Sequence, residues 1–126
     1  MTSRRGARRT ALELLYQWDL TGQPLASLHS GDVDPFALAL AEGVAAQADE
    51  LDARITAASD EWPADRLGVV ERNIVRVGLF ELERGDVPVE VAIDEAVSLA
   101  KRYASEDAGR LVNGILGRLA REAQQT

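Results

Sequence analysis

The sequence predicts an all-α protein, a compact bundle of about six or seven helices. Glycine and proline interrupt the chain at helix-length intervals, and the apolar residues between interruptions recur with a period close to 3.6. No segment shows the alternation of apolar and polar residues that is typical of a half-buried strand. The length of 126 residues suits one hydrophobic core, so we expect a single domain over 1–126.

The first half of the chain predicts three helices, over about 5–20, 34–48 and 49–58. The buried stripe of the first helix consists of five apolar residues at helical spacing: Ala7, Ala11, Leu14, Leu15 and Trp18. This helix ends at 21–24, where Gly22 and Pro24 interrupt it. Asp34 and Pro35 supply an N-cap and a first-turn proline for the second helix. Trp62 and Pro63 are expected to break the chain after the third helix, at the end of the first half.

The second half predicts three longer helices. The first of them carries two apolar stripes and is therefore expected to be central: Leu67, Val70, Ile74 and Val77 form one stripe, and Val75, Leu79 and Leu82 the other. A stop at 85–88 separates it from a helix that reaches Tyr103. Ser105 is a suitable cap for the last helix. Helical periodicity continues through Asn113 and Gly114, which excludes a hairpin turn there.

Opposite charges are segregated along the chain, although the formal net charge is −7. Residues 1–10 hold four arginines and no acid, and residues 101–126 hold five basic and three acidic residues. Residues 11–100 hold five arginines and 18 acids. Because local potential decides where a polyanion binds, we expect a basic and an acidic surface on one molecule.

The sequence lacks the residues that several classes of function require. The chain has no cysteine and one histidine, so we expect no disulfide, no metal centre and no cofactor. It shows neither a secretion signal nor a stretch of roughly 20 apolar residues that could span a bilayer, which indicates the cytoplasm and no membrane partner. The carboxylate pairs at 94–95 and 106–107 point about 100° apart on a helix and form no acid–base dyad. We therefore expect a binding protein and not an enzyme.

Two groups of basic residues are candidates for RNA binding. The first lies in an arginine-rich N-terminal segment, 1–8, that could be mobile, and in the helix that follows it: Arg4, Arg5, Arg8 and Arg9. Arg8, Leu12 and Tyr16 are spaced by four residues, so we expect them on an exposed stripe where tyrosine can stack on a base. The second group surrounds the last inter-helix junction: Lys101, Arg102 and Arg110. A solvated basic tail and ordinary helix capping are the alternatives.

The order and spacing of several motifs resemble the NusB family of bacterial transcription antitermination factors. In the first half they are Arg5-Gly-Ala-Arg-Arg at 5–9, Ala11-Leu-Glu-Leu-Leu-Tyr-Gln-Trp at 11–18, and Trp62. In the second half they are Val70-Glu-Arg-Asn-Ile-Val-Arg, Phe80-Glu-Leu, Asp86-Val-Pro, Ala92-Ile-Asp-Glu-Ala, Leu99-Ala-Lys, Glu106-Asp and Val112-Asn-Gly-Ile-Leu. The resemblance covers nearly the whole chain.

The resemblance implies a fold of two small helical sub-bundles and an adaptor function. Family members pair with NusE, a ribosomal small-subunit protein, on the single-stranded boxA element of nascent RNA, notably in ribosomal RNA operons. With other antitermination components they help RNA polymerase to read through terminators. The implied RNA contacts include Arg5, Arg8 and Arg9, with Arg4 nearby, and continue over Arg72, Arg76, Lys101 and Arg110. The implied partner contacts are Tyr16, Glu71 and Asp107.

Some positions depart from the family pattern, and some alternatives stay open. Gly6 stands where a basic residue is common, and Arg9 replaces a usual acid. Exposed Tyr16 or Tyr103 could support a homodimer. One alternative function is the N-terminal RNA-binding domain of an RNA cytosine methyltransferase, and another is a purely structural interaction protein whose arginines are only solvated.

Overall fold

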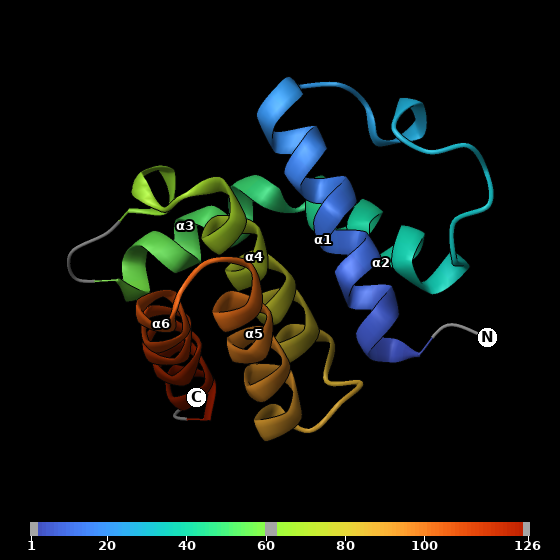
Figure 1. Ribbon diagram of the computed structural model, residues 1–126. Helices are drawn as coiled ribbons and strands as arrows, with labels where there is room; N and C mark the ends of the chain where they lie inside the picture. The colour runs from blue at the N-terminus through green and yellow to red at the C-terminus, as the bar shows by residue number, and fades with distance from the viewer. Residues whose placement is uncertain (1–2, 60–62, 125–126) are drawn as a thin grey trace.

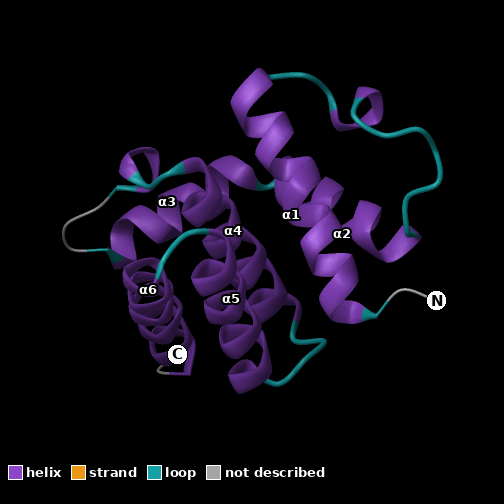
Figure 2. Ribbon diagram, in the orientation of Figure 1, coloured by secondary structure: helices purple, strands orange, loops and turns teal. Residues whose placement is uncertain are grey.

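The computed structural model describes residues 3–59 and 63–124, and these form helices without strands (Figures 1 and 2). Six are α-helices and two are short 3₁₀ helices, η1 and η2: α1 (Arg4–Thr21), η1 (Leu25–Ser27), α2 (Pro35–Ala46), α3 (Ala48–Ala58), η2 (Ala64–Arg66), α4 (Val69–Arg84), α5 (Val89–Tyr103) and α6 (Glu106–Gln124). The all-α prediction is therefore confirmed. None of these helices has the length and apolar character needed to span a membrane.

Capping residues define the helix ends, and Gly22, Asp34 and Ser105 were predicted from the sequence. The Ser3 hydroxyl accepts a hydrogen bond from the Gly6 amide at 3.0 Å, so residues 4–8 of the N-terminal segment form the opening turns of α1. Gly22 ends α1 with a φ of 74°, a conformation that favours glycine. Asp34 accepts from the Phe36 amide at 2.8 Å, and Ser105 accepts from the Ala108 amide at 3.0 Å. Residues 1–2 and the predicted breaker Trp62 lie outside the described residues.

Helix α4 lies at the centre of the fold and contacts the other five α-helices (Figure 1). α1 and α2 pack against each other in one sub-bundle. α5 and α6 pack against each other and against α4 in the second, and α3 lies against α4 and α6. The central position follows from the two apolar stripes of α4, because each stripe needs a different neighbour.

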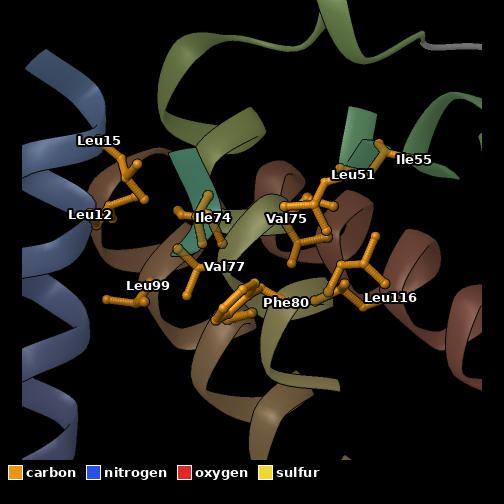
Figure 3. Packing of buried hydrophobic residues seen from close by; sticks show 14 of the residues in the cluster. Leu12, Leu15, Leu51, Ile55, Ile74, Val75, Val77, Phe80, Leu99 and Leu116 are labelled. Atoms are coloured by element: carbon orange, nitrogen blue, oxygen red, sulfur yellow. The ribbon is translucent and has the colours of Figure 1, made fainter. Parts of the chain in front are cut away.

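The core surrounds α4 on both sides (Figure 3). Ile74 and Val77 from one stripe are at most 3% exposed, as are Val75 and Leu79 from the other. Gly43 on α2 lies against the ring of Phe80, which leaves no room for a side chain at that position. α2 therefore packs closely on α4, and α1 and α5 also pack on α4.

Candidate nucleic-acid interface

A groove of about 440 Å³ lies between α1 and α5, which both pack on α4. Four of the predicted RNA-binding residues line it: Arg5, Arg9, Lys101 and Arg102. Arg5 and Arg9 are one helical turn apart on α1, and the other two lie in the last turn of α5. Glu95, Ser98 and Leu99 complete its wall. We call this the cationic groove.

A second groove of about 260 Å³ adjoins the first, because Arg9 lines both. Tyr16 from α1 and Tyr103 from α5 lie in its wall and are 39% and 40% exposed. The guanidinium of Arg102 lies 5.7 Å from the centre of the Tyr103 ring. We call this the tyrosine groove. The expected exposure of Tyr16 is confirmed, and its ring is available to stack on a base or to contact a protein partner.

Arg5 is held at the cationic groove by Glu95 of α5. Its Nε and Nη2 atoms donate to the two carboxylate oxygens at 3.1 Å and 2.9 Å. The side chain of Glu95 is 15% exposed, whereas that of Arg5 is 72% exposed. The hydrogen bonds and charge of Arg5 lower the pKa of Glu95, so this carboxylate stays ionised at neutral pH.

The expected exposure of Arg8 is wrong. Arg8 is 4% exposed, and its Nε and Nη2 atoms donate to the Glu81 carboxylate of α4 at 2.8–3.1 Å. The hydrogen bonds from Arg8 to Glu81 raise the pKa of the guanidinium. Leu12, which we expected on the same exposed stripe, is 6% exposed. α1 is covered on this side because it packs against both α2 and α4, which buries a wider face than the predicted stripe.

Arg72 and Arg76 also point into the fold and join α4 to α1 and α3. Arg76 is 5% exposed and donates two hydrogen bonds to the Asp52 carboxylate in a bidentate pair, at 2.6 Å and 2.7 Å. The carboxylate of Asp19 accepts from Arg72 at 2.9 Å, from Arg76 at 3.0 Å and from Asn73 at 3.1 Å. Burial lowers the pKa of Arg76, but the bonds and charges of Asp52 and Asp19 outweigh it and raise that pKa overall. Both arginines are thus occupied by acids of this chain.

The remaining predicted residues lie outside the two grooves. Arg4 is exposed and stacks on the Phe36 ring of α2, with its guanidinium carbon 4.0 Å from the ring centre. Arg110 is exposed and pairs with Asp107, also exposed, in the first turn of α6. Glu71 is half-buried on α4, next to Val70 of the tyrosine groove.

Sequence reasoning missed the acids that hold these arginines. Glu81 is 73 positions from Arg8, and Glu95 is 90 positions from Arg5. Such separations leave no periodic signal, and the excess of acids in 11–100 showed only that partners exist. Among the described residues, no cluster of histidine, cysteine and carboxylate side chains could hold a metal ion. The arrangement provides a cationic groove beside an aromatic one, which suits phosphates and unstacked bases.

Comparison with known proteins gives one consistent family. The NusB family model matches residues 5–121. The transcription antitermination protein NusB of Solibacter usitatus is 38% identical, with 97% of this chain and 91% of that protein covered. Its counterpart from Anaeromyxobacter dehalogenans is 41% identical, with 95% of this chain and 92% of that protein covered.

Solved structures agree with these relatives. The crystal form of T. maritima NusB matches with a TM-score of 0.85 and 33% identity, over 97% of this chain and 94% of that one. A chain from a crystal structure of the antitermination factors NusB and NusE with double-stranded RNA matches with a TM-score of 0.83 and 33% identity, over 94% of this chain and 96% of that one. On its sequence, its fold and its nearly full-length relatives, the chain belongs to the NusB family.

Proposed function

We propose that this protein is a non-catalytic transcription antitermination factor that pairs with NusE on boxA RNA and promotes read-through by RNA polymerase. The observation that carries the proposal is the convergence of Arg5, Arg9, Lys101 and Arg102 on one groove. These residues come from opposite ends of the sequence, and α1 and α5 bring them together. A protein that acts on nascent bacterial transcripts works in the cytoplasm.

The RNA site is assigned to the accessible cations. Arg5, Arg9, Lys101 and Arg102 bind phosphates in the cationic groove, because guanidinium and ammonium groups there donate to phosphate oxygens. Arg4 and Arg110 are exposed and extend this basic surface. Arg8, Arg72 and Arg76 stabilise the fold, since buried or part-buried acids occupy them.

The partner site is assigned to the tyrosine groove, to Glu71 beside Val70 of that groove, and to Asp107 of α6. Tyr16 and Glu71 come from α1 and α4, and Asp107 lies at the start of α6. A basic ribosomal protein suits the two acids, and an exposed tyrosine offers both an apolar ring and a hydroxyl. The structural neighbour that contains NusB and NusE with RNA supports the pairing.

The relatives favour an adaptor over the methyltransferase domain. They are matched over nearly their whole length and carry the name of an antitermination protein. Selective RNA binding distinguishes the adaptor from the purely structural alternative. Arginines that are only solvated would not bind one RNA sequence more tightly than another.

A titration of labelled boxA RNA tests the proposal. A scrambled RNA of equal length and the boxA duplex serve as controls, each with and without NusE at two salt concentrations. We expect selective binding to boxA that tightens when NusE is added and weakens with salt. Equal, weak binding to all three RNAs that NusE leaves unchanged would contradict the proposal and favour a structural interaction protein.

A further inference from the structure

Among the described residues that line the cationic groove, Glu95 alone is acidic. A carboxylate in such a place repels phosphate, so on charge alone it opposes RNA binding. Its side chain is nevertheless well covered, at 15% exposed, and it points at Arg5 and not into solvent. The geometry of that contact indicates that Glu95 has a role in binding other than repelling phosphate.

Glu95 occupies one edge of the Arg5 guanidinium and leaves the other accessible. A guanidinium carries five N–H groups in a planar, rigid fork. The bonds of Nε and Nη2 to Glu95 use the side edge, at 3.1 Å and 2.9 Å. The end edge, formed by Nη1 and the second N–H of Nη2, has no other acceptor among the described residues. With the side chain 72% exposed, that edge is open to the groove.

We propose that Glu95 is a positioning residue for RNA binding, which holds the side edge of Arg5 on α5 and presents its end edge to a phosphate in the cationic groove. This inference rests on the proposed function and deepens it. A free arginine loses rotamer freedom when it binds a phosphate, and Glu95 removes part of that loss before RNA arrives. The cost is the negative charge of Glu95 on the adjacent edge of the same guanidinium, which Arg9, Lys101 and Arg102 of the cationic groove offset.

Positioning and simple charge predict opposite effects of removing the carboxylate. If Glu95 acts only through its charge, Glu95→Ala tightens RNA binding, because a phosphate meets less repulsion. If Glu95 positions Arg5, Glu95→Ala weakens RNA binding by about threefold to tenfold, the range that lost rotamer order allows. Glu95→Asp separates geometry from charge, because it keeps the charge and shortens the side chain by one methylene.

The experiment is a double-mutant cycle on labelled RNA. Arg5→Ala, Glu95→Ala, Glu95→Asp and Arg5→Ala/Glu95→Ala are titrated with boxA and with scrambled RNA at several salt concentrations. We expect both Glu95 variants to bind more weakly, and the double variant to bind no more weakly than Arg5→Ala. The salt dependence should fall for Arg5→Ala, which loses one phosphate contact, and stay close to that of the wild type for Glu95→Ala, in which Arg5 still binds the phosphate at a larger entropic cost. Thermal unfolding confirms that each variant is folded.

Asp94→Ala is the matched control. Asp94 is the exposed neighbour of Glu95 on α5, and it forms no ion pair with any described residue. Its removal takes away the same charge and leaves Arg5 in place, so we expect RNA binding to stay equal or to tighten slightly. Weaker binding of Asp94→Ala by the same factor as Glu95→Ala would overturn the positioning role, because a general effect on α5 would then explain both.

The outcomes separate this inference from the proposed function. Tighter binding of Glu95→Ala, or independent effects of the two single variants, would overturn the positioning role while boxA selectivity of the wild type stands. Coupled effects on both RNAs, with no boxA preference in the wild type, would support the positioning role and contradict the antitermination function. Absence of RNA binding by the wild type at low salt would overturn both.

Discussion

Arg8 and Arg9 are neighbours on α1, but their side chains lie in different environments. Arg8 points between α1 and α4, where Glu81 binds it, and Arg9 lines both grooves. A rotation of about 100° per residue separates the two directions. Adjacent arginines in a basic segment are therefore not equivalent, and only one of these two is accessible to RNA.

Arg8→Ala should destabilise the protein by about 3–5 kcal/mol, because it leaves the Glu81 carboxylate buried and unpaired. Urea denaturation measures the loss, and Arg9→Ala is the matched control with an expected change within about 0.5 kcal/mol. Replacing the pair by apolar residues, Arg8→Met with Glu81→Leu, should restore most of the stability. An Arg8→Ala variant of unchanged stability that binds RNA weakly would instead make Arg8 an RNA contact.

The Arg5–Glu95 pair makes a pH-dependent contribution to stability. Arg5 lowers the pKa of Glu95 in the folded protein below the unfolded value of about 4.3. The contribution is therefore complete above about pH 4.3 and is lost as pH falls through the lowered folded pKa. The difference in unfolding free energy between wild type and Glu95→Gln should stay constant from neutral pH to about pH 5 and shrink below it. A difference that grows on acidification would contradict this ion pair.

At the scale of the elements, α4 was the most predictable part of the fold. Its two apolar stripes indicated a helix with neighbours on both sides, and the structure confirms this. The polar side of the same helix was not predictable. The resemblance implied that Arg72 and Arg76 contact RNA. Their acidic partners, Asp19 and Asp52, lie on α1 and α3, and helical periodicity does not report which elements approach one another.

Two helical glycines should respond oppositely to alanine. A Cβ at Gly43 of α2 would overlap the Phe80 ring, so we expect Gly43→Ala to cost about 1–3 kcal/mol, more than the helix propensity it gains. Gly114 of α6 has no neighbour within 4 Å of an added Cβ, so Gly114→Ala should stabilise by up to about 1 kcal/mol. Chemical denaturation measures both. Equal effects at the two positions would contradict the close packing of α2 on α4.

At the scale of the whole molecule, the charges that are segregated along the sequence are only partly segregated on the surface of the fold. Arg5 and Arg9 from the basic start meet Lys101 and Arg102 across one groove, as a basic surface requires. Sequence counting placed cations at both ends of the chain, but it could not show that α1 and α5 lie side by side on α4. It also could not show which arginines are neutralised internally, because that depends on contacts across the bundle.

Salt dependence distinguishes accessible cations from the protein's total charge. Arg9→Ala, Arg102→Ala and Arg54→Ala each remove one positive charge, but Arg54 on α3 pairs with Glu83 and does not line the cationic groove. The slope of log affinity against log salt for single-stranded boxA RNA should fall by about 0.7 for each groove variant, since each loses one phosphate contact. It should be unchanged for Arg54→Ala. Equal slopes for all three variants would mean that RNA responds to net charge, and the groove would then not be the binding site.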